Sequence, residues 1–482
     1  MRNSLNLNPD EVFFYFEELC KIPHGSGNTK AVSDYCVNFA KAHNLEYHQD
    51  EINNVIIIKE ATPGYENAEP IIIQGHLDMV CEKEEDCNID FEKDGLDLYV
   101  DGDLLKARGT TLGGDDGIAI AFGLALLEKE DLEHPRMEMI FTVDEETGMD
   151  GVQGIDLSPI KGHIMLNIDS DEEGIFLTSC AGGAEVNISL PVERQKAEGT
   201  ILKITVNGLV GGHSGAEIHK ERGNANKLIA RVLKKLYDSV DFKMAELAGG
   251  QKHNAITRMA YATIVVDDSD VLIVNNIVKE IEADFKNEYR TADKDVFVSV
   301  EKLDGNSIEV IDPTSLTKII FLLREIPYGV QAMSVEIPDL VETSMNLGIS
   351  KLEKDAYNLC VSIRSSVSSR KYELVDRVIF LGEFLGADAS KGDDYPAWEY
   401  KKESVVRGKI ADLYKELFNE EPQIKAIHAG LECGYFDSMI KNLDAVSFGP
   451  ANYDIHTPQE RLSISSTEKY WKLLVEFLRR AK

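Results

Sequence analysis

The stretch Ile-Ile-Ile-Gln-Gly-His-Leu-Asp, residues 71–78, constrains the fold more than any other part of the sequence. Its three β-branched residues predict a short buried strand. His76 and Asp78 follow at the strand end, where alternate residues of an extended backbone point the same way. Because open α/β sheets place their chemistry beyond the carboxyl ends of strands, both side chains can face one site. A metal-bound histidine oriented by a carboxylate is one interpretation, and a plain polar strand end is the other.

Length and charge narrow the class of protein. The chain has 482 residues, too many for one ordinary core, so we expect two domains. Its 51 Lys and Arg against 84 Asp and Glu give a net charge of −33, which argues against nucleic acid or an anionic membrane as partner. The first ten residues lack the apolar core of a signal peptide. Seven scattered cysteines favour free thiols in a reducing compartment. We therefore expect a cytoplasmic enzyme that binds cations or small zwitterions.

Further acidic residues follow other predicted strands and loops. A Gly-Gly pair places Asp115 and Asp116 at the start of an apolar helix, and two later strands end at Glu145-Glu146 and at Asp169. Adjacent carboxylates repel each other and are costly unless they are solvated or bind cations. Helix capping and a solvated turn are the alternative interpretations of these groups.

The sequence pattern changes near residue 182. From there, predicted strands and helices alternate without metal-binding residue types at the strand ends. This pattern indicates a second α/β domain inserted into the first. The predicted boundaries are 1–181 and 395–482 for the two parts of the first domain and 182–394 for the insertion. The last helix is predicted to start at Ser465, because Ser-x-x-Glu is a capping box.

Taken together, the strand-end groups provide two histidines and several carboxylates, a donor set that suits a pair of Zn²⁺ ions. They are His76, Asp78, Asp115, Glu145, Glu146, Asp169 and His456. A shared carboxylate would hold the ions close together, as in two-metal aminopeptidases. Two Zn²⁺ with three carboxylates need one bridging hydroxide for neutrality. One glutamate of the 145/146 pair is then free to act as general base.

Eight blocks span essentially the whole chain: Gln-Gly-His76-Leu-Asp78-Met-Val, Gly-Thr-Thr-Leu-Gly-Gly-Asp115, Asp-Glu145-Glu146-Thr-Gly, Asn-Ile-Asp169, Gly-Gly-His213-Ser-Gly, His-Asn254-Ala-Ile, His-Ala-Gly-Leu-Glu432-Cys-Gly and His456-Thr-Pro. In these blocks and their order the sequence resembles the aminoacyl-histidine dipeptidases, also called peptidase D or cytosol nonspecific dipeptidases. That family belongs to the co-catalytic zinc peptidases. The resemblance implies an α/β fold, with a mixed sheet flanked by helices in the catalytic domain and an inserted α/β lid domain.

The resemblance also implies a role for each site residue. His76, Asp115 and Asp169 would hold one zinc, and Asp115, Glu146 and His456 would hold the other. Asp78 would orient His76, and Glu145 would be the base that helps the bridging hydroxide to attack the scissile carbonyl.

Other residues would contact the substrate. The resemblance implies that His213, from the lid, docks the substrate or stabilises the oxyanion, and that Asn254, Arg364 and Glu432 line the substrate site. One departure concerns Asp116, which stands where the family usually has Asn. Asp115 keeps the bridging role because it follows Leu-Gly-Gly, as in the family block.

These roles imply a dizinc dipeptidase of broad specificity, including Xaa-His substrates, in which Mn²⁺ or Co²⁺ would fit the same ligands. A tripeptidase, a carboxypeptidase-type enzyme or an N-acyl amino acid deacylase is the alternative, since specificity would lie in the lid pocket. A non-catalytic binding relative is a third hypothesis, against which the presence of Glu145 and of every expected ligand argues. The resemblance is compatible with a homodimer through the lid domain.

Overall fold

The computed structural model describes residues 2–482, which divide into two compact units. The first unit runs to Ser179 and resumes over Tyr400–Ala426 and Leu431–Lys482. The second comprises Cys180–Glu399 and Ile427–Gly430. The second unit is thus slightly longer than the predicted insertion, 182–394. It also takes in four residues, 427–430, that the sequence places in the resumed first domain.

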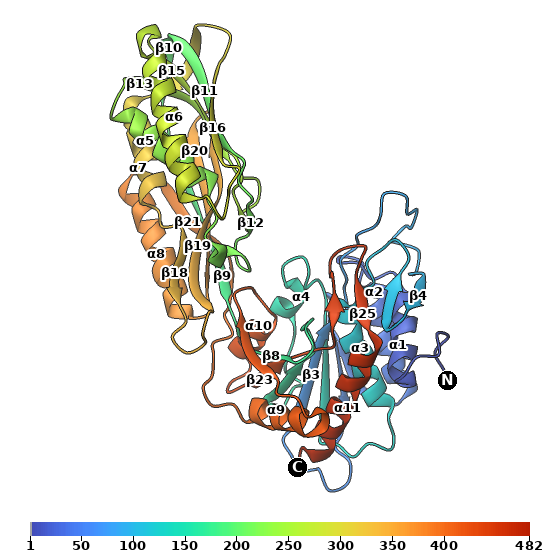
Figure 1. The fold of residues 1–482 in the computed structure, drawn as a ribbon. Helices are drawn as coiled ribbons and strands as arrows, with labels where there is room; N and C mark the ends of the chain where they lie inside the picture. Colours follow the sequence, from blue (N-terminus) through green and yellow to red (C-terminus); the bar gives the residue numbers. More distant parts are fainter. Residues whose placement is uncertain (1) are drawn as a thin grey trace. The chain divides into compact units, whose positions relative to one another are not determined.

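An eight-stranded mixed sheet forms the centre of the first unit, in the order β1-β2-β6-β3-β7-β23-β8-β22 (Figure 1). The neighbours β6, β3, β7 and β23 run parallel to one another, so their carboxyl ends share one edge. The strand bounds are β1 (Glu46–Gln49), β2 (Val55–Lys59), β3 (Ile71–His76), β6 (Met137–Thr142), β7 (Ile164–Asn167), β8 (Ile175–Cys180), β22 (Gln423–Ile427) and β23 (Asp444–Ser447). This mixed sheet with its helices confirms the predicted α/β class.

Helix α3 (Gly114–Glu128) is the central helix of this unit. It is apolar on all sides, and its side chains are buried from residue 118 to 127, as a helix enclosed by other elements must be. Phe122 stacks on Trp471 of α11, with 6.1 Å between the ring centroids. The other helices of the unit are α1 (Asp10–Cys20), α2 (Lys30–Ala42), α4 (Asp150–Gly154), α9 (Val405–Phe418), α10 (Cys433–Met439) and α11 (Ile464–Arg480).

A small four-stranded sheet in the order β24-β25-β5-β4 joins residues 98–107 to the carboxyl-terminal part of the chain. The pairing of β5 with β25 is antiparallel. Its strands are β4 (Leu98–Asp101), β5 (Leu104–Ala107), β24 (Asn452–Tyr453) and β25 (Arg461–Ser463). The loop between β24 and β25 carries His456, so this sheet anchors both ends of that loop.

The second unit is built on a nine-stranded antiparallel sheet in the order β16-β11-β15-β13-β19-β20-β9-β21, with β18 beside β19 (Figure 1). Its strands are β9 (Gly182–Pro191), β11 (Thr200–Asn207), β13 (Phe242–Gly249), β15 (Ala260–Val266), β16 (Phe297–Lys302), β18 (Gly329–Met333), β19 (Val341–Leu352), β20 (Ala356–Ser365) and β21 (Asp388–Tyr395). Two short pairs, β10 (Arg194–Glu198) with β17 (Ser307–Ile311) and β12 (Gly212–His213) with β14 (Ala255–Ile256), complete the strands of this unit.

Four helices pack their apolar faces on this sheet and form a second core with it. They are α5 (Ala225–Tyr237), α6 (Val271–Glu288), α7 (Pro313–Glu325) and α8 (Ser368–Phe384). Helix α5 begins at a side-chain cap, because Asn224 accepts a hydrogen bond from the backbone N–H of Asn226 at 2.9 Å. Each unit thus has its own core, as separate domains do.

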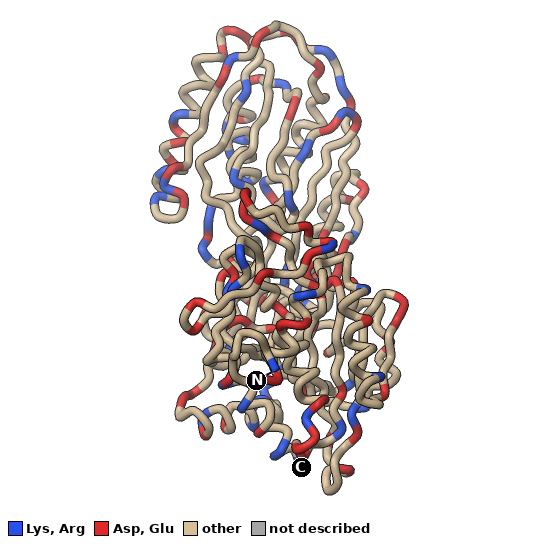
Figure 2. Tube along the Cα trace, turned by 90° about the vertical axis from the view of Figure 1, so that its right-hand side faces the viewer, with Lys and Arg blue, Asp and Glu red and all other residues tan. Residues whose placement is uncertain are grey.

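The surface charge is distributed over both units. Figure 2 shows acidic residues along the whole chain with Lys and Arg interspersed among them, so the net charge of −33 does not come from one acidic tail. Within residues 2–482, the apolar segments of the helices are all too short or too polar to cross a bilayer.

The packing of α3 on β6 yields a stability prediction. A Cβ on Gly123 would lie 2.7 Å from Cζ of the buried Phe141, closer than real contacts allow. Gly123→Ala should therefore lower the free energy of unfolding by about 1–2 kcal/mol, because overpacking outweighs the gain in helix propensity. Gly408→Ala in α9 is the matched control: nothing lies within 4 Å of its Cβ, so the variant should gain roughly 0.5–1 kcal/mol. Urea unfolding compares the two, and a stabilised Gly123→Ala would contradict the packing described here.

Candidate active site

The parallel strands of the first unit bring the predicted ligands to one edge of the sheet. Strand β3 ends at His76, the turn after β6 carries Glu145 and Glu146, and Asp169 follows β7 by two residues. Because β3 lies between β6 and β7, its histidine has carboxylates from both neighbouring strands beside it. The alternation of buried strands and helices in the sequence therefore determines which polar groups meet.

Asp115 lies between two histidines. Its Oδ1 is 3.0 Å from Nε2 of His76, and its Oδ2 is 3.2 Å from Nε2 of His456. Asp115 comes from the amino-terminal end of α3, whereas His456 comes from the β24–β25 loop, 341 residues away in the chain. One carboxylate that faces two imidazoles through its two oxygens has the arrangement expected of a shared ligand.

Asp78 holds the other side of His76. Nδ1 of His76 lies 3.0 Å from the backbone oxygen of Asp78 and 3.5 Å from its carboxylate. The same carboxylate accepts hydrogen bonds from the backbone N–H groups of Glu145 and Glu146, at 3.1 and 3.3 Å, and from the Ser26 hydroxyl at 2.8 Å. Asp78 can therefore orient the imidazole and the glutamate turn together.

Three groups of side chains at this edge have ligand atoms within 4.8 Å of one another. They are Asp115, Glu146 and His456; His76, Asp116 and Asp169; and His76, Glu145 and Glu146. The first group equals the ligand set expected for one of the two ions. The second differs from the set expected for the other ion, because Asp116 stands beside His76 and Asp169 in the place of Asp115.

Crowding and burial shift the pKa values of these groups. Burial raises the pKa of Asp169 to about 7 and that of Asp171 to about 8. Nearby carboxylates contribute to both shifts, because they repel a further negative charge. Burial likewise raises the pKa of Glu145 well above its usual range. Asp115 and Glu146 raise the pKa of His456 to about 11. The site therefore favours added positive charge.

The donor atoms fit divalent cations. Oε1 of Glu146 is buried and lies 2.8 Å from Nε2 of His456, yet the two atoms are not aligned as a hydrogen bond. Two ligands of one ion approach each other in this way without bonding to each other. Imidazole nitrogens with carboxylate oxygens suit Zn²⁺, Mn²⁺ or Co²⁺. The residues present can thus hold metal, with Asp115 as the group common to both histidines.

Glu432 lies buried in the same unit, although it comes from the block after β22. Its Oε2 accepts hydrogen bonds from Gln74 Nε2 at 2.6 Å and from Thr142 Oγ1 at 2.7 Å, while its Oε1 has no hydrogen-bond partner. Burial raises the pKa of this carboxyl to about 7. Glu432 thus offers a buried acceptor that is still unused.

The remaining predicted residues lie in the second unit and gather there around Gly215. His213 and Asn254 belong to neighbouring segments of the chain, since Ser214 N–H donates to the Asn254 carbonyl at 2.9 Å. A Cβ on Gly215 would lie 3.1 Å from both His213 Cε1 and Arg364 Nε and 2.5 Å from the carbonyl oxygen of His428. Only glycine lets His213, Arg364 and His428 approach this position so closely.

Within this cluster the charge is positive. Arg364 is 8% exposed, and its Nη1 donates to the Tyr395 hydroxyl at 2.5 Å while its Nε has no hydrogen-bond partner. Burial, reinforced by Arg364, lowers the pKa of His428 to about 3, and burial also lowers the pKa of His213. A buried guanidinium beside neutral imidazoles can receive a carboxylate.

Sequence reasoning missed several residues that belong to these sites. Ser26 and Asp171 carry no motif that could have identified them. His428 is the first residue of the block that contains Glu432, and Glu460 lies four residues after His456. Their place beside identified residues was the only signal available.

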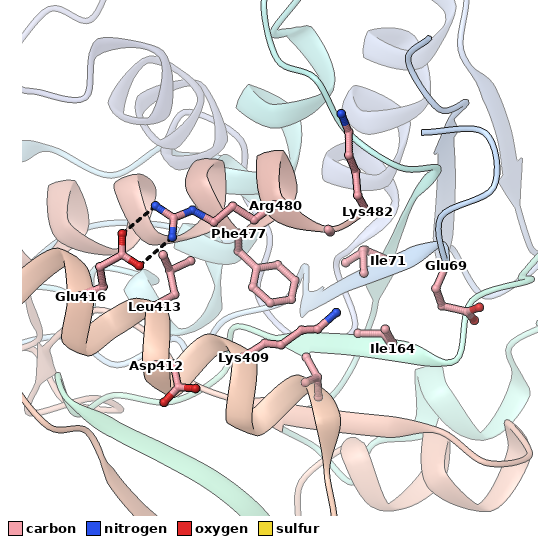
Figure 3. Close-up of a pocket in the computed structure, with 12 residues that line it drawn as sticks. Glu69, Ile71, Ile164, Lys409, Asp412, Leu413, Glu416, Phe477, Arg480 and Lys482 are labelled. Carbon is pink, nitrogen blue, oxygen red and sulfur yellow. Dashed lines mark hydrogen bonds and ion pairs between the residues drawn. The ribbon is translucent and has the colours of Figure 1, made fainter. Parts of the chain in front are cut away.

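A hollow of about 320 Å³ lies at the other end of the parallel strands, between α9, α11 and the first residues of β3 and β7 (Figure 3). Phe477 points into it, and the ion pair between Arg480 and Glu416 lies at its rim. None of the twelve residues that line it is a histidine or cysteine. Its apolar floor carries no group suited to the chemistry described above.

The chain is similar to known proteins over nearly its whole length. The chain is 37% identical over 475 residues to the cytosol non-specific dipeptidase of Escherichia coli (strain K12), covering 98% of both proteins. The structure of aminoacylhistidine dipeptidase from Vibrio alginolyticus is similar, with a TM-score of 0.91, 34% identity and coverage of 98% of this chain and 97% of that one. An aminopeptidase from Bacillus cereus ATCC 10987, at 14% identity, a TM-score of 0.57 and coverage of 98% and 99%, shares the fold.

The family model described as peptidase family M20/M25/M40 matches residues 72–480. This match begins at β3, the strand that ends in His76, and ends within α11. Together with the two dipeptidase relatives, it confirms the resemblance predicted from the sequence blocks. The chain therefore belongs to the peptidase family M20/M25/M40.

Proposed function

We propose that this chain is a metal-dependent dipeptidase with two divalent cations in its first unit. The observation that carries the proposal is Asp115, whose two oxygens face His76 and His456 at 3.0 and 3.2 Å in a pocket of carboxylates. The two relatives above 30% identity are named as dipeptidases. In this proposal His76, Asp115 and Asp169 hold one ion, and Asp115, Glu146 and His456 hold the other. Asp116 is available as a further ligand beside His76.

The metal pair, when bound, would lower the pKa of a water molecule and polarise the scissile carbonyl. Glu145 takes the proton from that water and returns it to the leaving amine, as a general base that becomes a general acid. Burial raises the pKa of Glu145 above its usual range, which makes its carboxylate a stronger proton acceptor. Asp78 keeps Glu145 in place through the backbone N–H, and it keeps His76 oriented through Nδ1.

Substrate recognition uses the two charged ends of a dipeptide. We propose that Arg364 receives the carboxylate, because its buried guanidinium has no carboxylate among its described hydrogen-bond and ion-pair partners. The unused Oε1 of Glu432 is suited to the substrate ammonium. His213 and Asn254 are the further substrate-binding residues that we propose in the second unit. A free ammonium and a free carboxylate are the substrate features that these contacts select, and Xaa-His dipeptides carry both.

The same metal site could serve a tripeptidase or an N-acyl amino acid deacylase. A deacylase substrate lacks the ammonium group and therefore cannot use the contact proposed for Glu432. Zn²⁺ is the proposed metal, with Mn²⁺ or Co²⁺ as substitutes. We also propose a cytoplasmic location, since the Escherichia coli relative is named as a cytosol enzyme.

A homodimer through the second unit is the proposed assembly. Phe380 and Phe384 of α8 are 67% and 76% exposed, and Phe321 of α7 is 44% exposed. Residues four apart lie on one face of a helix, so Phe380 and Phe384 form a continuous apolar strip. Exposed aromatic residues are typical of protein interfaces.

The first prediction concerns metal. Adding Zn²⁺ or Co²⁺ to chelator-treated protein should raise its unfolding temperature, by an amount equivalent to about 2.7 kcal/mol at a hundredfold excess over the dissociation constant. Asp115→Asn should lose most of this shift. Asp312→Asn, at the cap of α7 in the second unit, is a control that should keep it. Scanning calorimetry measures the shift, and no shift for the parent protein would argue against a metal centre.

The second prediction tests the reaction itself. Metal-loaded protein should release amino acids from unblocked dipeptides and from β-alanyl-histidine, and chelator should abolish this release. An N-acetyl amino acid and a dipeptide amide should be poor substrates, because each lacks one of the two charged ends, and a tripeptide should be cleaved poorly by a dipeptidase. Glu145→Gln should lose at least 10²-fold in kcat, the usual contribution of a general base, with unchanged metal content. Preference for the tripeptide or the N-acetyl compound would select the alternative function.

The third prediction concerns assembly. Replacing Phe380 and Phe384 with Glu should convert a dimer into a monomer, because two charges would have to be desolvated at the interface. Val405→Glu is the control: Val405 is 64% exposed on α9 of the first unit, so its replacement should leave the mass unchanged. Light scattering after size exclusion gives the mass. A monomeric parent protein, or a double variant that remains dimeric, would contradict this interface.

A further inference from the structure

Glu460 is a buried carboxylate with an unusual set of partners. It is 3% exposed, and its two oxygens accept hydrogen bonds from four consecutive backbone N–H groups. Oε2 receives Leu112 at 2.7 Å and Gly113 at 3.0 Å, and Oε1 receives Gly114 at 2.8 Å and Asp115 at 3.3 Å. Successive N–H groups that converge in this way form an anion-binding nest.

The two glycines of this turn make the nest possible. Gly113 has a φ of +69°, which side-chain-bearing residues rarely adopt. A Cβ on Gly114 would lie 2.8 Å from Nδ2 of Asn452, and that same nitrogen donates to Glu460 Oε1 at 3.1 Å. The Gly-Gly pair before Asp115 thus lets the backbone wrap closely around a carboxylate.

Glu460 also belongs to the loop that carries His456. This loop is held internally, since Glu460 N–H donates to the Thr457 carbonyl at 3.0 Å and Thr457 Oγ1 donates to the Asp454 carbonyl at 2.7 Å. The side chain of Glu460 therefore connects two segments 345 residues apart: the turn that ends in Asp115 and the loop that presents His456.

We infer that Glu460 is a positioning residue for the two-cation site: its carboxylate fixes the Asp115 turn against the His456 loop. The inference rests on the proposed function. Five N–H donors and no hydroxyl surround the carboxylate, so a group that only accepts hydrogen bonds is required there. A glutamine would turn its NH₂ toward N–H groups and repel them.

The consequence reaches the metal ligands through the backbone. Asp115 can face both histidines only if its backbone is held within a fraction of an ångström, because its oxygens lie 3.0 and 3.2 Å from them. Partners that orient metal ligands typically contribute 10–100-fold to metal affinity. We therefore expect Glu460 to affect cation binding first, and turnover only through it.

The test is a titration of the metal-free, full-length protein with Co²⁺, followed by calorimetry and by visible absorption of the bound ion. Glu460→Gln should bind at least one of the two ions about 10–100-fold more weakly, with an altered absorption band. At saturating Co²⁺ its kcat should recover toward that of the parent. A merely structural residue would shift neither the absorption band nor the affinity.

Glu138→Gln is the matched control. Glu138 is also fully buried in the first unit, and its carboxylate accepts hydrogen bonds from the backbone N–H groups of Lys161 and Gly162. This variant should lose stability but keep the parent Co²⁺ affinity and spectrum. If Glu460→Gln behaves like Glu138→Gln, the inference is wrong.

Two further variants cover the case in which Glu460→Gln does not fold. Glu460→Asp keeps the charge but shortens the reach, and Asn452→Ala removes one donor and leaves the nest intact. Both should weaken Co²⁺ binding by a smaller factor, and parent-like affinity in both would overturn the inference. A parent protein that binds no Co²⁺ at all would instead refute the proposed function, so the two failures are distinguishable.

Discussion

The mutual repulsion of carboxylates at one edge of the central sheet is the constraint that the first unit has to satisfy. Asp115, Glu146 and Asp169 are held close to His76 and His456. Such a cluster is costly by itself, and the surrounding structure holds it through fixed donors, such as the backbone N–H groups that meet Asp78. Cations would relieve the repulsion, so stability and metal binding are linked in this unit.

Much of this arrangement could be predicted from the sequence, because it follows from the strands. His76 is the last residue of one short buried strand and Asp169 follows another by two residues, and parallel neighbours must bring their carboxyl ends to the same edge. The positions of Asp115 and His456 in the site were predicted from the resemblance of their sequence blocks to those of the family. The start of α11 was less accessible: Ser463 caps it, whereas the sequence predicts Ser465. Asp103 accepts hydrogen bonds from both serines, and this tertiary partner is invisible in a local pattern.

The same limit applies to the second unit. No periodic pattern places Arg364, on a long strand, beside the loop of Gly215, and the four residues 427–430 return to this unit after the chain has already re-entered the first. From the sequence, His428 therefore had no role of its own. In the structure its Nε2 forms a hydrogen bond of 2.7 Å with the Ser344 hydroxyl, and it completes the cluster. Contacts between segments so distant depend on tertiary packing, which local propensity does not encode.

The order of strands in the central sheet has a consequence for biosynthesis. Strand β7 pairs with β23, which is synthesised only after the whole second unit, and His456 follows later still. Pairing over such sequence distances is slow, because the closure entropy of the chain must be overcome first. An incomplete nascent chain accordingly contains most of the carboxylates but neither the second imidazole nor the finished sheet. Because the proposed function requires His456, hydrolysis can begin only after that residue has been made.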